Sequence, residues 1–268
     1  MKKLNIPVWF FVHDFIPYYY PQYCTKSVVK AFKKWIKTVI NYSGLICNSK
    51  TTMNETFEFL KNLKKSEYNK NIKIDYIHIG TDFIQKKEHL KNKENLQFLA
   101  VSTVEPRKKY DQIVGAFEIL WNKGADFKLN IVGRAGWNNE KTINLIRNSK
   151  FYNKNLFWHE KYISDQKLEE LYESSCALIF ASETEGFGSP LIEAIANNVP
   201  LIVRDLDVFR EVTENNAFFF KGFNAEDLAN AIENWIELYK NDKEPLADIK
   251  LYNWKESTDE VCKIMKLK

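Results

Sequence analysis

Two glutamates, Glu185 and Glu193, enclose a short segment, GFGSP, after which a helical pattern begins. Glycine lets the backbone approach a ligand closely, and the first N–H groups of a helix lack internal partners and favour an anion. A carboxylate one turn into the helix, as at Glu193, can accept hydrogen bonds from a diol such as ribose. Glu185, on the loop, can reach a second part of the same ligand. Taken alone, this spacing is more simply explained by a helix start with a capping glutamate.

A pair of cations, Arg107 and Lys108, lies in the sequence VSTVEPRKKYDQI, between an expected strand and an expected helix. A guanidinium can donate two parallel bonds to phosphate oxygens, and an ammonium supplies a point charge. Facing a helix N-terminus, the two would form a diphosphate site, whereas a bare RKK turn is more often a solvated basic turn. Gly133, which ends the strand pattern LNIVG, would let a base or a ribose pack on bare backbone.

The elements that must position these residues are short apolar runs alternating with amphipathic stretches. Runs such as LQFLAVS and CALIFAS are apolar throughout, which is typical of parallel strands covered by helices on both faces. The expected fold is therefore α/β. Six strands expected between residues 96 and 240 form a complete doubly wound domain, while about three strands precede the polar, lysine-rich stretch 85–95. Ligands of such sheets bind beyond the carboxyl ends of the strands, where the loop 183–188 is expected.

The composition excludes several classes of protein. The 268 residues are 45% hydrophobic, enough for a sizeable core, and the net charge of +4 is too small to predict nucleic-acid binding. The four cysteines are scattered, which favours free thiols in a reducing cytoplasm over disulfides or zinc, and no metal site is expected. The apolar run near the N-terminus is broken by His13 and Asp14, so it predicts a buried strand rather than a signal peptide.

Several segments together resemble family 4 glycosyltransferases, which are retaining enzymes with two Rossmann-like domains, the B-type fold. The similarity to their nucleotide-binding domain lies in VSTVEPRKKYDQIVGAFEIL, LNIVGRAGW, residues 161–203 and the later REV. Upstream, VHDFIPYYYP and GLICNSKTT resemble the later part of the acceptor domain, and IHIGTDF resembles the segment that leads into the linker. The resemblance covers nearly the whole chain, with its motifs in the family's order.

This resemblance implies roles for individual residues. Glu185 would contact the donor sugar near the reacting carbon, Glu193 would hold the nucleotide ribose, and His13 would line the sugar site. Lys108, with Arg107 nearby, would bind the diphosphate. The remaining donor-binding positions are Thr103, Gly133, Gly186, Phe187 and Gly188. The implied reaction uses a nucleoside-diphosphate sugar, no further cofactor and no metal. The sequence DLD, from Asp205 to Asp207, mimics a metal signature of another fold but is interpreted as a helix cap.

Three positions or regions depart from the family pattern. Ser102-Thr103 replaces a usual Gly-Arg, so Arg107 would serve as the phosphate-binding arginine, and Ser189 replaces a usual leucine. Family members also carry roughly a hundred further residues ahead of VHDFIP. We therefore expect a partial acceptor-side domain and linker over residues 1–94 and a nucleotide-sugar-binding domain over 95–268. Its last helix, about 255–267, would pack back on the first domain. An open sheet edge would be covered by a partner chain, self-association or a membrane.

The stretch TKSVVKAFKKWIKTVINYS predicts a helix with one apolar face, five lysines and no acidic residue. Such a helix either packs into a core with a solvated lysine face or lies on anionic lipid. The predicted function is a retaining glycosyltransferase in the cytoplasm or at the inner face of the membrane, acting on a polysaccharide or lipid-linked cell-envelope acceptor. One alternative is a nucleotide-sugar-binding subunit or inactive half of a split enzyme. A nucleotide-sugar 2-epimerase is the other, and EPRK together with EGFGSP argues against it.

Overall fold

The computed structural model describes residues 6–82 and 91–267. The chain forms two compact units, and the first comprises Met1–Ile84, Glu185–Gly188 and Leu251–Lys268. The second comprises Gln85–Thr184 and Ser189–Lys250. Both units contain a parallel sheet with helices, which confirms the expected α/β class. Of the lysine-rich stretch 85–95, where the domain boundary is expected, residues 85–90 lie outside the described residues.

The second unit is built on a six-stranded sheet in which every strand pair is parallel, with the order β6-β5-β4-β7-β8-β9. The strands are β4 (Gln97–Val101), β5 (Lys128–Val132), β6 (Leu156–His159), β7 (Ala177–Phe180), β8 (Leu201–Arg204) and β9 (Phe218–Phe220). All four residues of β7 and of β8 are buried, as continuous apolar runs predict. The strand order reverses between β4 and β7, which is where ligands of such sheets bind.

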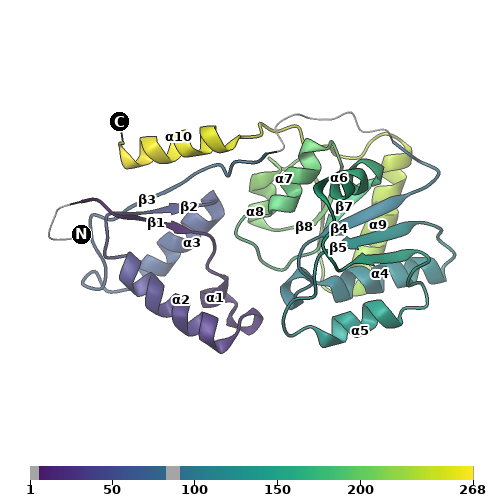
Figure 1. Ribbon diagram of the computed structural model, residues 1–268, viewed down its shortest axis with the longest axis horizontal. Helices are drawn as coiled ribbons and strands as arrows, with labels where there is room; N and C mark the ends of the chain where they lie inside the picture. The colour runs from purple at the N-terminus through teal and green to yellow at the C-terminus, as the bar shows by residue number, and fades with distance from the viewer. Residues whose placement is uncertain (1–5, 83–90, 268) are drawn as a thin grey trace. The chain divides into compact units, whose positions relative to one another are not determined.

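Helices cover both faces of this sheet. They are η3 (Pro106–Lys108), α4 (Tyr110–Asn122), α5 (Glu140–Asn148), α6 (Asp165–Ser174), α7 (Ser189–Ala196), α8 (Asp207–Val212) and α9 (Ala225–Lys240). Figure 1 draws α4 and α5 on one side of the strands and α6 and α7 on the other. Helices α4 and α9 pack against each other, and their buried aromatic side chains Phe117 and Trp235 both contact Phe98 of β4. This core fixes the strand ends that carry the expected donor site.

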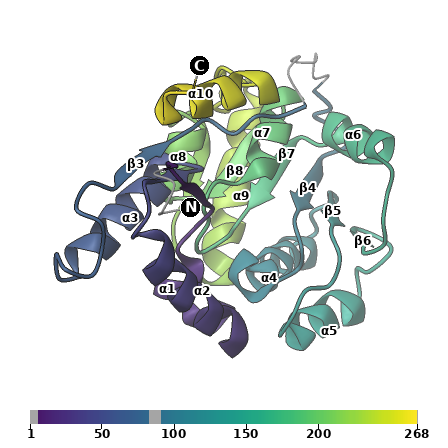
Figure 2. The same cartoon turned by 60° about the vertical axis from the view of Figure 1, so that its left-hand side comes forward.

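The first unit contains three parallel strands in the order β1-β2-β3. They are β1 (Trp9–Val12), β2 (Gly44–Cys47) and β3 (Lys73–Tyr76). The helices are α1 (Ile16–Tyr19), η2 (Pro21–Tyr23), α2 (Lys26–Val39), α3 (Lys50–Lys61) and α10 (Trp254–Met265). Figures 1 and 2 place α2 and α3 on one side of the strands and α10 on the other. Ser257 of α10 donates to the carbonyl of His78, 2.7 Å away, so this helix is anchored just beyond β3.

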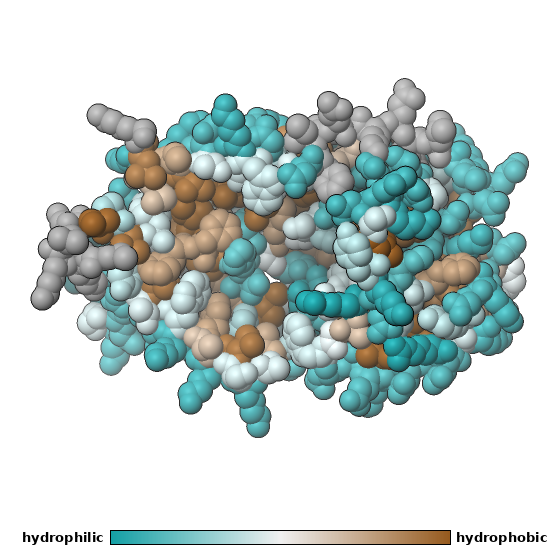
Figure 3. Space-filling model, in the orientation of Figure 1, coloured by the Kyte–Doolittle hydropathy of each residue, from teal (hydrophilic) through white to brown (hydrophobic). Residues whose placement is uncertain are grey.

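Strand β1 lies at one edge of this sheet and is only partly covered. Val12 is buried, but Trp9, Phe10 and Phe11 are half-buried. The ring of Trp9 lies over Gly44 of β2, where a Cβ would meet ring atoms at 2.3 Å. Figure 3 shows apolar side chains gathered at the surface of this unit. Among the described residues, β1 therefore pairs with a strand on one side only, and aromatic side chains lie beside its other edge.

Helix α2 uses its apolar face within the first unit. Ile36, Val39 and the following Ile40 are buried in a core with Phe15 of the β1–α1 loop and Leu45 of β2. Its lysines are exposed, and these are Lys26, Lys30, Lys33, Lys34 and Lys37. The C-terminal part of the apolar face is thus occupied by the core, while the lysines and Val28 are exposed.

Glu55 of α3 makes the stability of the first unit depend on pH. Burial, with a smaller contribution from the nearby Asp14, raises the pKa of Glu55 from 4.5 to about 7. Because the folded state holds this proton more tightly than the unfolded state, its contribution to stability is lost as pH rises from 4.5 to 7. We expect Glu55→Gln to raise the melting temperature at pH 8 and to change it little at pH 4. Glu58→Gln, an exposed neighbour in α3, is the control, and equal shifts for both variants would contradict this cause.

Candidate active site

The expected donor-binding residues of the second unit lie at the carboxyl ends of β4, β5 and β7. Thr103 and the turn Pro106–Lys108 follow β4, and Gly133 follows β5. An isolated parallel bridge between Val104 and Ala135 continues the pairing of these two strands beyond their ends. The residues are thus grouped at the switch point of the sheet, where the crevice of a doubly wound fold opens.

Arg107 is tied to its own loop and to the segment that follows β7. Its Nε lies 3.2 Å from Oε2 of Glu105, a carboxylate that is itself buried. Its Nη1 donates to the carbonyl of Thr184 at 3.2 Å, and its own carbonyl accepts from the N–H of Glu183 at 2.9 Å. The side chain therefore joins the loop after β4 to the residue before Glu185, in addition to any contact with a ligand.

Lys108 is buried at the same strand end, with 8% of its surface exposed. Its Nζ lies 4.8 Å from the centre of the Phe180 ring, at the end of β7. An ammonium at this strand end can form a charge-assisted hydrogen bond to a phosphate oxygen. The next residue, Lys109, adopts a left-handed conformation with φ of 56° and leads into α4.

Glu193 is positioned by a partner that the sequence did not reveal, Tyr172 of α6. The Tyr172 hydroxyl donates to Oε2 of Glu193 at 2.8 Å, and the tyrosine is fully buried. Burial raises the pKa of Glu193, and the bond from Tyr172 partly opposes this shift. One oxygen of this half-buried carboxylate is therefore held in place.

Removing the Tyr172 hydroxyl is expected to weaken the Glu193 site without destroying it. Tyr172→Phe keeps the ring in the core but removes one hydrogen bond to a carboxylate, so nucleotide affinity should fall about fivefold. The pKa of Glu193 should rise further, because the bond that opposes the burial effect is lost. Calorimetric titration across pH checks both effects. Tyr152→Phe, in a different part of the unit, is the control, and unchanged affinity in Tyr172→Phe would contradict the role.

Three glycines of the expected site are required by the backbone itself. Gly133 has φ of 147°, and a Cβ there would lie 1.9 Å from the carbonyl oxygen of Ser102. Gly188 has φ of 102° and ends the loop immediately before α7. A Cβ on Gly186 would lie 2.0 Å from the carbonyl oxygen of His13. Close packing on neighbouring backbone explains glycine at 133 and 186, and the left-handed φ explains it at 188, whatever ligand is bound.

The loop Glu185–Gly188 belongs to the first unit, where it lies against His13 and the start of α3. The carbonyl of Gly186 accepts from the Ser49 hydroxyl at 2.7 Å and from the Thr52 hydroxyl at 3.3 Å. His13 is exposed just beyond β1, with its ring 4.9 Å from that of Phe11. The structure therefore brings His13 and the Glu185 loop together, and Phe187 of the same loop is half-buried.

The interpretation of DLD as a helix cap was wrong. The N-cap residue of α8 is Leu206, and no side chain caps the helix. Asp205 instead pairs with Arg210, whose Nε lies 2.6 Å from its carboxylate, and with Lys221 at 3.6 Å. The arginine falls one turn into α8, so an ion pair replaces the cap. Within residues 6–82 and 91–267, no group of three or more His, Cys, Asp or Glu side chains is arranged to hold a metal ion.

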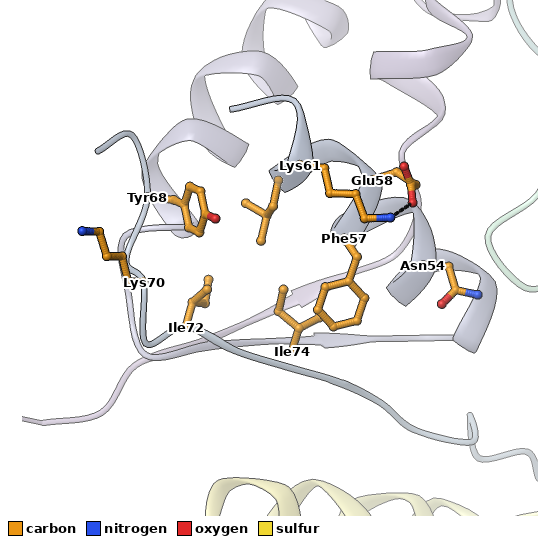
Figure 4. Close-up of a pocket in the computed structure, with 9 residues that line it drawn as sticks. Asn54, Phe57, Glu58, Lys61, Tyr68, Lys70, Ile72 and Ile74 are labelled. Atoms are coloured by element: carbon orange, nitrogen blue, oxygen red, sulfur yellow. Dashed lines mark hydrogen bonds and ion pairs between the residues drawn. The ribbon is translucent and has the colours of Figure 1, made fainter. Parts of the chain in front are cut away.

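A pocket of about 510 Å³ lies elsewhere in the first unit, between α3 and β3 (Figure 4). It is lined by Asn54, Phe57, Glu58, Leu60, Lys61, Tyr68, Lys70, Ile72 and Ile74. Lys61 and Glu58 form an ion pair at its rim. None of the expected site residues lines this pocket, and β3 begins at Lys73, so the pocket lies near the amino end of that strand. It is distinct from the strand ends described above.

No helix in the part of the chain that the structure describes is both long and apolar enough to cross a membrane. Comparison with solved structures shows the fold. The chain superimposes on sucrose-phosphate synthase from Thermosynechococcus elongatus with a TM-score of 0.74 and 17% identity, over 99% of this chain and 68% of that one. The score is 0.73 with 14% identity for Anabaena Alr3699/HepE in complex with UDP and glucose, over 99% and 73%. The fold is therefore the B-type glycosyltransferase fold.

Sequence comparison adds closer relatives. The serotype-specific mannosyltransferase WbdA of Escherichia coli is 35% identical over 277 residues, which is 98% of this chain and 34% of that protein. The O-antigen chain mannosyltransferase RfbU of Salmonella typhimurium is 31% identical over 231 residues, covering 85% of this chain and 60% of RfbU. The chain thus spans about a third of the length of WbdA. A family model described as glycosyl transferases group 1 matches residues 81–249, and the chain belongs to this family.

Proposed function

We propose that this chain transfers a sugar from a nucleoside-diphosphate donor to a glycan or lipid-linked acceptor of the cell envelope. The observation that carries the proposal is the Glu193 carboxylate of α7, the helix that follows β7, with one oxygen held by Tyr172. Its other oxygen suits a ribose diol. The buried Lys108 at the neighbouring strand end suits a diphosphate. The names of WbdA and RfbU favour mannose as the sugar.

The proposed reaction retains the anomeric configuration and needs no metal ion. As the bond from the sugar to the diphosphate breaks, negative charge grows on the leaving phosphate. Lys108, Arg107 and the N-terminus of α7 stabilise this charge. Glu185 and His13 contact the sugar, and the acceptor hydroxyl attacks from the face that the diphosphate leaves. Thr103, Phe187 and the site glycines shape the donor pocket.

A transfer assay tests the proposal directly. The chain is incubated with nucleoside-diphosphate mannose and a mannose-terminated oligosaccharide, in the presence of a chelator, and the product is analysed by mass spectrometry and NMR. We expect an α-linked product from an α-linked donor, formed in the chelator. An inverted product would contradict retention, and strict dependence on added metal would contradict metal-independent transfer. Glucose and galactose donors with the same nucleotide serve as controls for the sugar.

A second candidate function is a nucleotide-sugar-binding half that needs a partner chain. The observation that favours it is the β1 edge, which no other described strand covers and where Trp9, Phe10 and Phe11 are half-buried. This candidate predicts donor binding without transfer by the isolated chain, and self-association in light scattering. A monomer that is fully active, and gains nothing from a partner or from lipid, would exclude it.

The proposed place of action is the cytoplasm, at the inner face of the membrane. Five exposed lysines on α2, with no acidic residue in the helix, suit an anionic lipid surface. The attraction between these lysines and anionic lipid would be electrostatic and sensitive to salt. Cosedimentation with anionic and neutral vesicles at low and high salt tests it. Equal sedimentation with both kinds of vesicle would contradict this role of α2.

A further inference from the structure

Arg204 is a buried cation at the end of β8 that the donor site described above does not use. Only 3% of its surface is exposed. Its Nε donates to the carbonyls of Ala181 and Ser182, at 3.0 and 3.1 Å. Its Nη1 donates to the carbonyl of Gly222, and its Nη2 donates to the side-chain carbonyl of Gln112. Every nitrogen of the guanidinium thus has an acceptor within the second unit.

The surroundings of Arg204 compensate for the burial of its charge. The guanidinium lies over two aromatic rings, 5.1 Å from the centre of Phe220 and 4.5 Å from that of Phe223. Burial lowers the pKa of Arg204, and the carboxylates of Glu183, Asp111 and Asp227 oppose this shift. The residue remains charged, since an arginine pKa lies far above neutrality. Arg204 donates to backbone carbonyls of the protein, which indicates that it restrains the backbone of the segments that carry them.

Gln112 extends this arrangement into α4. Its Nε2 donates to the carbonyl of Asn224 at 2.7 Å, while its Oε1 accepts from Arg204. Gln112 is buried, and it lies one turn beyond the cations of the preceding turn Pro106–Lys108. Arg204 and Gln112 therefore connect the end of β7, the start of α9 and the start of α4.

The segment that Arg204 holds leads directly to Glu185. Its side chain binds the carbonyls of Ala181 and Ser182. Arg107 binds the next two residues, accepting from the N–H of Glu183 and donating to the carbonyl of Thr184. Four consecutive residues are thus each held by an arginine, and the next residue along the chain is Glu185. When the backbone is held at four successive residues, the residue that follows has little conformational freedom.

We propose that Arg204 is a positioning residue. Together with Gln112, it fixes the backbone of residues 181–184 and thereby the position at which the chain enters Glu185. This inference rests on the proposed function, in which Glu185 acts on the donor sugar. Loss of the guanidinium would free the segment before Glu185 and leave the nucleotide contacts of Glu193 and Lys108 in place. Turnover should fall while nucleotide affinity is retained, since misplacement of a reacting group by about 1 Å can cost about 100-fold in rate.

The test compares Arg204→Lys with Arg210→Lys. Arg210 is the matched control, because it also lies over a ring, that of Phe219 at 4.3 Å, and pairs with a carboxylate, but it makes no contact with the segment 181–184. For Arg204→Lys we expect turnover to fall by about 10- to 100-fold, with nucleoside-diphosphate affinity within about threefold of wild type. Amide hydrogen exchange in residues 181–188 should become faster, and the control should change none of these.

Equal losses of turnover and affinity in Arg204→Lys, or unchanged exchange in residues 181–188, would overturn the proposal. If Arg204→Lys does not fold, Gln112→Leu removes the acceptor of one Nη and the link to Asn224 while keeping the arginine, and the same readouts apply. Hydrogen exchange is measured without ligand, so it decides the role of Arg204 even if the wild-type chain neither binds nucleotide nor transfers sugar. That last result would count against the proposed function alone.

Discussion

Replacing Glu185 by glutamine is expected to lower turnover by about 100-fold and to leave nucleoside-diphosphate affinity nearly unchanged. Glutamine keeps the size of the side chain and its ability to hydrogen-bond, but it removes the negative charge. If Glu185 acts on the sugar as positive charge develops at the reacting carbon, that charge matters most in the transition state. The nucleotide contacts proposed for Lys108 and Glu193 are not altered by this substitution.

The measurement is a pair of titrations on the same preparation. Calorimetry with the nucleoside diphosphate gives the affinity, and initial rates at saturating donor give the turnover. Glu170→Gln is the matched control, since Glu170 is an exposed glutamate of α6 that pairs with the exposed Lys167. If Glu185→Gln reduces affinity and turnover by the same factor, Glu185 is a binding residue or a structural one, and its proposed action on the sugar is wrong.

The fold class was predictable because its signals are local. Apolar runs such as CALIFAS become the buried strand β7, and the helix after it places Glu193 one turn from its start, as the pattern SPLIEAIA predicts. The parallel order of strands follows from the alternation of strands and helices, since parallel neighbours need a crossover connection. Such features depend on consecutive residues, so they can be predicted without knowing which elements become neighbours in space.

The partners of the site residues were not predictable in this way. Tyr172 belongs to the buried face of α6, and nothing near it in the sequence distinguishes its hydroxyl from that of another core tyrosine. Arg204 ends an apolar strand, and its acceptors at residues 112, 181, 182 and 222 come from three other parts of the chain. Both contacts depend on how strands are ordered in space. Short sequence patterns do not record that order.

Local patterns also misled where two interactions competed for one residue. Asp205 lies just before a helix, which favours a cap, yet an arginine one turn into α8 takes its carboxylate as an ion pair. The hydrogen bond from Arg210 lowers the pKa of Asp205 and so favours its charged form, although burial opposes this shift. A capping pattern therefore needs a check for cations at helical spacing before it is interpreted.

Glu193→Ala is expected to weaken nucleoside-diphosphate binding by about 1–3 kcal/mol, or about 5- to 150-fold, in the presence of a chelator. Two effects contribute to this loss. The ribose loses a charged acceptor, and the buried Tyr172 hydroxyl loses its partner. Glu193→Gln separates them, since its amide oxygen can still accept from Tyr172 while the charge is removed. Its affinity should lie between those of wild type and Glu193→Ala.

The pH dependence of binding gives an independent check on Glu193. Burial raises the pKa of its carboxyl above the ordinary value, and Tyr172 only partly opposes the shift. A protonated carboxyl accepts hydrogen bonds less well, so affinity should fall on acidification at a higher pH than an ordinary glutamate would give. The variant Glu193→Gln has no proton to gain, and its affinity should therefore lack this component. If wild type and Glu193→Gln show the same pH profile, or if the wild-type chain binds nucleotide only with added magnesium, the ribose contact proposed for Glu193 is wrong.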